Sequence, residues 1–434
     1  YFVKREMCDQ LSQLYSFSIL PREVKLMIFK HIIPSDLRAV SLVCKEWHNL
    51  SYDPTLWKIL EISNQSCTSI FQEIIERLTL LNKVNMSSCD NANEFLELFS
   101  KHCPMLEVLN VSDCKRVDLN SLCLLASECE LIKSLTFKNL KDTTPESLQA
   151  LAKFNNLTHL GLYNCGVLND EALINISKSC KKLIDVNIDE IYELTDFSVA
   201  ALIKGCCLTL RRLLLDGEML TDASYGLLHH CIHLRVLGIS YAYSLGEEGI
   251  MSIASLKSLL WLKIAKCEAS SSTFLKLFCS EKTFPVIHLD LSDCSQINNE
   301  CVERIVMTCP LLSCFLISWS YLITEEGVAK VLKFGKNIRC LTLLGLIMLN
   351  GDFLFDIVEE MPNLSFLNVQ ECNQIDEGMT NSVKLLRPSM QVVDSYGYYV
   401  SLDHTENKFS YFTDTPLECL DSKILMNIDV GSFR

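Results

Sequence analysis

Apolar residues recur along this chain in one pattern, Leu-x-x-Leu-x-Leu, repeated every 24 to 27 residues. Clear copies begin at Leu106, Ile132, Leu157, Leu183, Leu210, Leu234, Leu259, Val286, Leu312, Ile338 and Leu364, and weaker ones at Trp57, Leu81 and Met390. A repeat of this length supplies one short strand and a return segment, and it cannot bury its apolar face without a neighbour. The pattern therefore predicts a solenoid, whose function should be binding.

The return segments show helical spacing. Leu173 and Ile176 are three residues apart before Cys180, and Val302, Ile305 and Val306 show the same spacing. Plausible N-caps are Thr195, Thr221 and Thr324. Because a helix needs about 10 Å of width and a strand about 4.8 Å, the stack must curve. We predict an α/β leucine-rich-repeat solenoid with parallel strands on the concave face and helices on the convex face.

Twelve of the 22 cysteines fall at two fixed positions of the repeat. The turn after the strand holds Cys89, Cys114, Cys165, Cys267, Cys294 and Cys372, and the helix end holds Cys103, Cys129, Cys180, Cys207, Cys231 and Cys309. A small, buried, unpaired side chain suits both positions, so we expect free thiols that act as small hydrophobes. This usage indicates a reducing compartment, the cytoplasm or the nucleus.

The first sixty residues carry a different pattern, which predicts three short helices. Pro21 suits the first turn of one helix and Asp36 the cap of the next. The first helix is apolar nearly all round, through Val24, Leu26, Met27, Ile28, Phe29, Ile32 and Ile33. A unit of about 40 residues is too small to cover so much apolar surface by itself. We therefore expect this segment to need a partner besides its own repeats.

Marker residues of this segment span Phe17 to Trp57 and include Leu20-Pro21, Ile28-Phe29, Asp36-Leu37 and Leu42-Val43-Cys44-Lys45. Their spacing resembles an F-box, and the repeats resemble the cysteine-containing leucine-rich repeats of F-box proteins. The resemblance implies docking to the Skp adaptor, and through it to cullin and RING subunits. It places at the contact Phe17, Leu20, Pro21, Val24, Ile28, Phe29, Leu37, Val40 and Val43. Trp47 is expected in the internal core, and the alternative is a helical cap that only seals the first repeat.

Charge and hydropathy limit the partners. Residues 1–60 hold eight Lys/Arg and six Asp/Glu, so the remaining 31 basic and 47 acidic residues leave the repeats at about −16. Nucleic-acid binding needs the opposite sign, whereas a basic protein segment would be attracted. Apolar runs of about 18 residues are missing, so no membrane span is expected.

The target surface is expected on the concave wall and its rim, where large rigid aromatics make the best anchors. The candidates are Tyr241, Tyr243, Trp261, Trp319 and Tyr321, together with an acidic patch of Asp189, Glu190 and Asp216 that suits a basic degron. The turns with paired aromatics also lack the repeat cysteine. The alternatives are a tyrosine that packs on its neighbour and an acidic patch that is simply solvated.

The sequence contains only weak signals for a catalytic or metal-binding site. His229-His230-Cys231-His233 has ligand-type side chains, but no Cys-x-x-Cys or His-Glu-x-x-His accompanies it. No phosphate-binding glycine loop is visible, and no cysteine stands out as a nucleophile. We expect no metal, cofactor or catalytic site.

The predicted organisation is an extension at 1–16, an F-box at 17–56, repeats at 57–395 (about 13–14 units) and a tail at 396–434 that caps the last strand or crosses the concave wall. The predicted function is a non-catalytic substrate receptor of a Skp/cullin/F-box ubiquitin ligase. Alternatives are a repeat scaffold or inhibitor without a ligase role and an enzyme in its own right.

Overall fold

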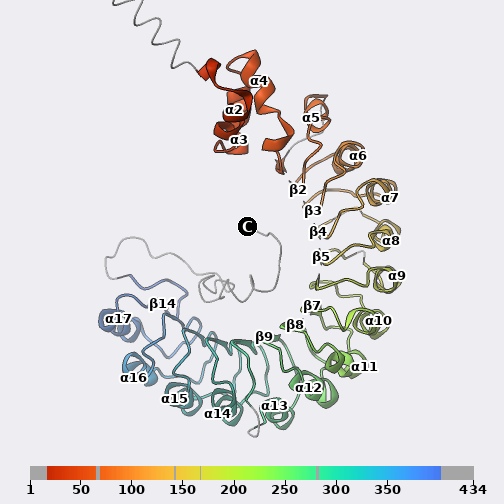
Figure 1. Cartoon of the computed structure of the whole chain (residues 1–434). Helices are drawn as coiled ribbons and strands as arrows, with labels where there is room; N and C mark the ends of the chain where they lie inside the picture. The colour runs from red at the N-terminus through yellow and green to blue at the C-terminus, as the bar shows by residue number, and fades with distance from the viewer. Residues whose placement is uncertain (1–16, 65–68, 141–142, 167, 280–282, 402–434) are drawn as a thin grey trace, which may run out of the picture. The chain divides into compact units, whose positions relative to one another are not determined.

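The structure, a computed structural model of the whole chain, describes residues 17–64, 69–140, 143–166, 168–279 and 283–401 (Figure 1). The chain divides into two compact units, Tyr1–Asn156 (unit 1) and Leu157–Arg434 (unit 2). The division falls inside the predicted repeats, so unit 1 contains the predicted F-box together with the first repeats.

Unit 1 begins with short helices and continues into repeats. The helices are η1 (Phe17–Ile19), α2 (Arg22–Phe29), α3 (Pro34–Ser41), α4 (Lys45–Ser51), η2 (Pro54–Leu56), α5 (Ser69–Ile75), α6 (Ala92–His102), α7 (Leu119–Glu128), α8 (Pro145–Gln149) and η3 (Ala150–Lys153). The strands are β1 (Ile59–Ser63), β2 (Lys83–Ser87), β3 (Val108–Ser112) and β4 (Ser134–Lys138), each parallel to the next. Among the described residues, three α-helices (α2, α3 and α4) and two short 3-10 helices (η1 and η2) precede β1, and the three short helices that the sequence predicts are present.

Unit 2 continues the same alternation. Its strands are β5 (His159–Tyr163), β6 (Asp185–Ile188), β7 (Arg212–Asp216), β8 (Val236–Ser240), β9 (Trp261–Ile264), β10 (His288–Asp290), β11 (Cys314–Leu316), β12 (Cys340–Thr342), β13 (Phe366–Asn368) and β14 (Gln391–Val393). Its helices are α9 (Asp170–Ser179), α10 (Asp196–Cys206), α11 (Asp222–Tyr225), η4 (Gly226–His230), α12 (Glu247–Ala254), α13 (Ser271–Leu277), α14 (Asn299–Thr308), α15 (Glu325–Phe334), α16 (Phe353–Glu360) and α17 (Glu377–Leu386).

The strands of unit 2 pair in parallel and in sequence order, and they line the inner side of its arc while the helices form the outer side (Figure 1). The alternation of side chains explains this arrangement. Leu213 and Leu215 of β7 and Val302 and Ile305 of α14 are buried, so alternate strand residues and one helix stripe supply the core between the two layers. The predicted solenoid of parallel strands backed by helices is confirmed.

Two of the three predicted threonine caps form. The side-chain oxygens of Thr195 and Thr221 accept the backbone N–H groups of Phe197 and Ala223, at 3.4 and 3.2 Å. Thr324 was predicted in the same role, but its side chain makes no cap bond. Its hydroxyl instead accepts from the Asn299 amide at 2.9 Å, which ties α15 to the preceding repeat.

The turn cysteines are buried and form no disulfide, as predicted. Three of these thiols donate to a backbone carbonyl of the preceding repeat, as Cys294 does to Ile264 at 3.2 Å. The thiols of Cys89, Cys114 and Cys165 donate to the carbonyl two residues earlier in their own repeat. One helix-end assignment needs correction. Cys206, not Cys207, is the buried residue at the end of α10, and it donates to the Cys180 carbonyl at 3.4 Å.

The described chain turns back on itself after β14. The Val400 N–H donates to the Val392 carbonyl at 2.9 Å, and Tyr399 packs on Cys314, Cys340 and Phe366. This short hairpin covers the inner face at the end of unit 2, so residues 396–401 do part of both roles proposed for the tail. Residues 402–434 lie outside the described residues.

Candidate binding surfaces

The helices at the start of unit 1 are held together by an aromatic core. The ring of Phe29, at the end of α2, lies 6.1 Å from Phe17 and 5.7 Å from Trp47 between ring centroids, and Phe17 and Trp47 are 5.2 Å apart. Offset and edge-to-face contacts of this kind stabilise small cores. The expected internal position of Trp47 agrees with these contacts.

Two residues that the sequence placed at the adaptor contact belong to this core instead. Phe29 is 1% exposed and Leu37 is 2% exposed. Both side chains face the packed interior, because α2 and α3 must each bury one apolar face against the neighbouring helices to stay packed. Their contribution to any contact is therefore to support the helices that carry it.

Polar contacts fix the helices further. The buried Lys25 amino group bonds to Glu46 at 2.5 Å, and Arg22 pairs with Asp53 at 2.6 Å. Burial acts to raise the pKa of Asp53, but hydrogen bonds from Thr55 and Arg22 outweigh it and hold that pKa below its usual value. These contacts orient α2 and α4, so their outer side chains are presented in fixed positions.

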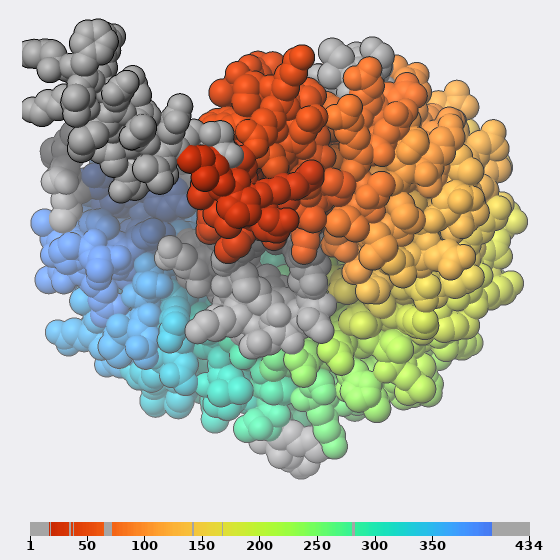
Figure 2. All heavy atoms as spheres, turned by 45° about the horizontal axis from the view of Figure 1, so that its top comes forward, coloured from red at the N-terminus to blue at the C-terminus, as the bar shows by residue number. Residues whose placement is uncertain are grey.

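An uncovered apolar face lies on the outside of these helices. Its members are between 38% and 83% exposed: Ile19, Val24, Met27, Ile28, Ile33, Leu42 and Val43. Of the remaining predicted contacts, Pro21 is exposed and Phe17, Leu20 and Val40 are half-buried. We name this surface the F-box face; its segment is the red region of the space-filling view (Figure 2). So large an apolar cluster marks an interaction site.

Sequence reasoning missed four members of this face, Ile19, Met27, Ile33 and Leu42. The signal was present for Met27 and Ile33, because the first helix is apolar on nearly every side. The sequence does not show which stripe of this helix is buried, because that depends on packing against α4.

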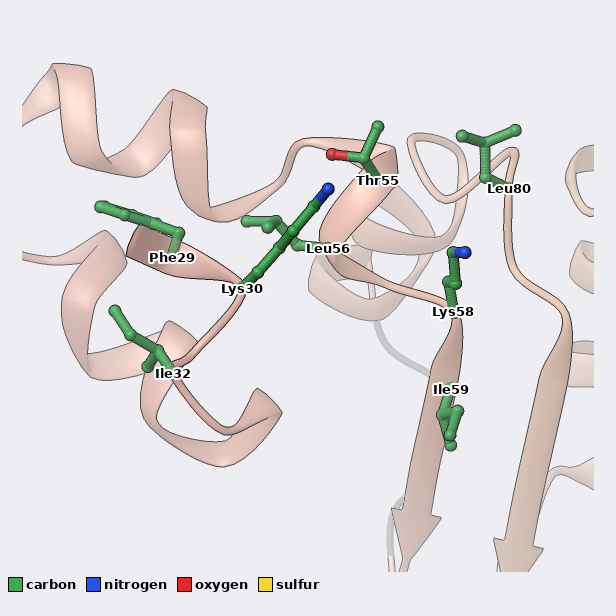
Figure 3. A pocket seen from close by; sticks show the side chains of 8 residues that line it. All are labelled: Phe29, Lys30, Ile32, Thr55, Leu56, Lys58, Ile59 and Leu80. Carbon is green, nitrogen blue, oxygen red and sulfur yellow. The ribbon is translucent and has the colours of Figure 1, made fainter. Parts of the chain in front are cut away.

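A cleft adjoins the F-box face within unit 1 (Figure 3). It encloses about 660 Å³ and lies between the end of α2, η2 and β1. Its lining residues are Phe29, Lys30, Ile32, Thr55, Leu56, Lys58, Ile59 and Leu80. The exposed side chains of Ile59 and Leu80 extend the accessible apolar surface toward the first repeat.

The second candidate surface is the inner face of unit 2. Register pairs Asp185 with Arg212, and Arg212 with Val236, along one row. The Nη1 group of Arg212 donates to both carboxylate oxygens of Asp185, at 2.9 and 3.0 Å. Further along the row, Trp261 stacks on His288 with ring centroids 5.0 Å apart. Trp261 is half-buried, so it offers only part of its ring to a target.

The turn after most strands contains one residue in the left-handed backbone region. In unit 2 these include Glu190, Tyr241 and Trp319, with φ of 58°, 54° and 58°. Asparagine and aspartate tolerate this conformation, whereas a bulky side chain there is uncommon and strained. Lys266 and Glu371 have the same conformation in their turns, so it is a feature of the repeat, and at Tyr241 and Trp319 this position carries an aromatic side chain.

Tyrosines from two turns meet beside β7. The ring of Tyr241 lies 6.0 Å from Tyr192 and 6.1 Å from Tyr243, and the Lys266 amino group is 4.2 Å from the Tyr241 ring centroid. Tyr192 follows β6 and Tyr241 follows β8, so the pair spans the turn after β7. Tyr192 was not among the predicted residues; its only signal was an aromatic two positions after Glu190.

The acidic residues lie at the same place. Asp216 ends β7 and is 4% exposed; its Oδ1 accepts the Glu218 N–H at 3.0 Å, and its Oδ2 has no hydrogen-bond partner among the described residues. Burial, together with the charges of Asp189, Glu218 and Glu190, raises the pKa of Asp216 to about 6. Such a group is costly to keep charged without a partner.

Asp189 and Glu190 flank this carboxylate from the preceding turn. Asp189 accepts from the Ser240 hydroxyl at 3.4 Å, and burial raises its pKa as well. The Tyr163 hydroxyl donates to Glu190 at 2.5 Å, which raises the pKa of Tyr163 to about 12. We name Asp189, Glu190, Asp216, Tyr192 and Tyr241 the acidic-aromatic site.

The remaining predicted anchors are elsewhere. Trp319 lies in the turn after β11, against Gly345, and Tyr321 is exposed in the same turn. They are three repeats from Tyr241. The structure thus brings the predicted acidic residues together with Tyr241 and Tyr243, and it places Trp319 and Tyr321 apart from them.

Groups with catalytic potential are poorly placed for chemistry. Burial raises the pKa of Cys103, Cys180 and Cys309 to about 12, which keeps these thiols protonated. His229 directs Nδ1 toward the Gly226 carbonyl at 2.6 Å. Within the part of the chain that the structure describes, no three His, Cys, Asp or Glu side chains form a metal-binding group, and no helix is long and apolar enough to cross a membrane.

Comparisons with known proteins match both parts of the chain. An F-box-like family model matches residues 17–63. F-box/LRR-repeat protein 21 of Mus musculus is 22% identical over 381 residues, which cover 79% of this chain and 81% of that protein. The SCF E3 ubiquitin ligase complex F-box protein pof2 of Schizosaccharomyces pombe is 25% identical over 197 residues, 42% of this chain and 41% of its own length.

Among solved structures, a chain in the crystal structure of a yeast Rad7 and Elc1 complex shares the fold. It has a TM-score of 0.56 and 15% identity, with 90% of this chain and 96% of that chain covered. The F-box-like match, the named relatives and the parallel-strand repeats agree: this chain joins an F-box-like domain to a leucine-rich-repeat solenoid and is similar to F-box/LRR-repeat proteins.

Proposed function

We propose that this chain is the substrate-recognition subunit of a Skp/cullin/F-box ubiquitin ligase. The F-box face docks the Skp adaptor, which links the chain to cullin and RING subunits, and the inner face of unit 2 holds a protein target. The similarity to an F-box protein of an SCF ligase complex supports this role. The chain acts without catalysis of its own.

The uncovered F-box face is the observation that carries the proposal. Seven apolar side chains are exposed on helices whose core is already complete, so their exposure serves no internal packing. Burying an apolar side chain of this size contributes about 1.5–3 kcal/mol, which is ample for a stable protein contact. A cap that only sealed the first repeat would not need these residues on its outer side.

Ubiquitin transfer would then be accelerated by proximity. A target held on the inner face is kept near a charged conjugating enzyme brought by the other subunits. Lysine attack becomes effectively intramolecular, and well-oriented reactions of this kind gain up to about 7–11 kcal/mol. The high pKa of the buried cysteines is consistent with leaving thioester chemistry to other subunits.

The adaptor contact can be tested by placing charges in it. Val24 and Ile28 lie four residues apart on α2, and both are exposed. In the double variant Val24→Glu, Ile28→Glu, two carboxylates must enter a dry interface without partners, so adaptor affinity should fall by at least about 100-fold. Co-purification with the Skp adaptor and cullin measures the loss.

The control is Phe197→Glu, which places one such charge at an exposed apolar residue of α10 in unit 2. This variant should capture the adaptor as the unaltered chain does. Undiminished capture by the α2 variant would overturn the adaptor contact and leave the alternative, a repeat scaffold or inhibitor without a ligase role.

A further inference from the structure

The acidic-aromatic site contains a buried anion that lacks a partner. Only 4% of the surface of Asp216 is exposed, yet its Oδ2 atom receives no hydrogen bond from any described residue. Native proteins pair nearly all such atoms, and an exception calls for a physical reason. A structural carboxylate would have acquired a donor on a neighbouring strand, but the residue paired with Asp216 on β8, Ser240, directs its hydroxyl to Asp189.

The surroundings of Asp216 favour a cation. Asp189 and Glu190 from one side and Glu218 from its own turn add negative charge, and these charges contribute to the raised pKa of Asp216. The positive charge of Lys263 acts on Asp189, whereas the charges that act on Asp216 are those of Asp189, Glu218 and Glu190. Arg212, at the opposite end of β7 from Asp216, is already paired with Asp185 of β6. The site therefore keeps an excess of negative charge.

The aromatic wall narrows the class of cation. Tyr192 and Tyr241 meet edge to face across the turn after β7, and the Lys266 amino group already occupies a position over the Tyr241 ring. A planar guanidinium can stack on a tyrosine ring while its N–H groups reach carboxylates, whereas an ammonium is a compact point charge with stronger hydration. The combination of flat rings and carboxylates from two turns suits arginine better than lysine.

We propose that the acidic-aromatic site binds an arginine side chain in a basic segment of the target, with Asp216 as the anion that pairs with the guanidinium and Tyr192 and Tyr241 as its aromatic wall. The proposal rests on the function proposed above, because it names the chemistry of the target that the inner face recognises. The left-handed conformation that Tyr241 shares with most turns of the repeat leaves its ring in contact with Tyr192.

The test uses the full chain and a short fluorescein-labelled peptide that repeats Gly-Arg-Ser, with binding followed by fluorescence polarisation near neutral pH. The variant is Asp216→Asn, which keeps the size of the side chain and removes the charge. The control is Asp293→Asn, the same change at an exposed acidic residue in the turn after β10. A second peptide replaces each arginine by lysine, and a third by citrulline.

We expect Asp216→Asn to lower the affinity for the arginine peptide by about tenfold. Asp293→Asn should change this affinity by less than about twofold. The lysine peptide should bind at least about fivefold more weakly than the arginine peptide, and the citrulline peptide should not bind. Equal losses in the two variants would show that only net charge attracts the peptide. Equal affinity for arginine and lysine would overturn the guanidinium assignment.

Failure here is distinguishable from failure of the ligase role. Adaptor capture depends on the F-box face and should be unchanged in Asp216→Asn. A chain that binds the arginine peptide through Asp216 but does not capture the adaptor retains this site and loses the ligase function. A chain that captures the adaptor but shows no preference for the arginine peptide retains the ligase function and loses this site.

Discussion

The F-box face and the acidic-aromatic site are opposite kinds of surface. The first exposes uncharged apolar side chains above a complete core, with buried Phe29 beneath exposed Met27 and Ile28. The second buries a charged group, Asp216, beside strained Tyr241. The first gains free energy by leaving water, and the second by finding a counter-charge. Under the two proposals, one surface suits a constant apolar partner and the other a partner selected by charge.

The comparison also separates residues that support a surface from residues that form it. Phe29→Ala removes a core ring that contacts Phe17 and Trp47, so we expect a loss of about 3–5 kcal/mol in the stability of the helices. Met27 lies on the exposed side of the same helix. Met27→Ala should therefore change stability by less than about 0.5 kcal/mol, because this side chain is already in water. Chemical denaturation followed by tryptophan fluorescence checks both values.

Adaptor capture should report on Met27 although stability does not. Met27→Ala weakens adaptor capture while leaving the helices folded. A large loss of stability in Met27→Ala would show that the F-box face is part of the core.

Asp216→Asn should stabilise the chain at pH 8. The folded-state pKa of Asp216 is about 6, above the ordinary value of 3.8, so its contribution to stability is complete below about 3.8 and is lost as the pH rises through about 6. Removing the charge should therefore recover about 1–3 kcal/mol at pH 8, and little near pH 4. Thermal unfolding at the two pH values measures the difference.

The groups that face Asp216 bear on this result. They are Asp189, Glu190 and Glu218, which raise its pKa, with Tyr225 packed behind the turn at Gly217. Asp293→Asn serves again as the control and should leave stability within about 0.5 kcal/mol. If Asp216→Asn instead destabilises the chain at pH 8, the carboxylate has a structural partner and is not kept for a ligand.

Salt should affect the two surfaces differently. Binding of the arginine peptide depends on charges and should weaken by about tenfold when the ionic strength rises from ~0.05 to ~0.5 M. Capture of the adaptor on the apolar F-box face should change by less than about threefold over the same range. Polarisation titrations and co-purification at matched salt concentrations test this contrast, and a common salt dependence would remove it.

The smallest expected effect concerns the strained turn. Tyr241→Asn relieves a left-handed conformation at a cost of ring contacts with Tyr192 and Lys266, so stability should change by less than about 1 kcal/mol. Binding of the arginine peptide should still fall, because the aromatic wall is lost. A variant with unchanged peptide affinity would assign Tyr241 to the turn alone.

The sequence predicted the repeats well because their signal is periodic. Leucine spacing located the strands, and the turn cysteines marked their buried positions. The exception, Cys206 in place of Cys207, shows the limit: which of two adjacent cysteines is buried depends on where α10 ends. Thr324 shows the same limit, because its cap was displaced by an amide from another repeat.

The candidate sites were predicted less completely for a related reason. Sequence grouped Phe29 and Leu37 with Val24 and Ile28, since all four are apolar, but the packing against α4 decides which of them face inward. The acidic residues and Tyr241 were identified as separate features on neighbouring repeats. Their meeting with Tyr192, and the missing partner of Asp216, depend on register across β6, β7 and β8, which single positions do not encode.

Hydrogen–deuterium exchange of the full chain, with and without the Skp adaptor, tests the central claim most directly. We predict that adaptor binding slows exchange in peptides that cover residues 19–43, where the exposed apolar residues lie, and leaves exchange in residues 185–241 of unit 2 unchanged. Adaptor binding without protection in residues 19–43, or no binding at all, would contradict it.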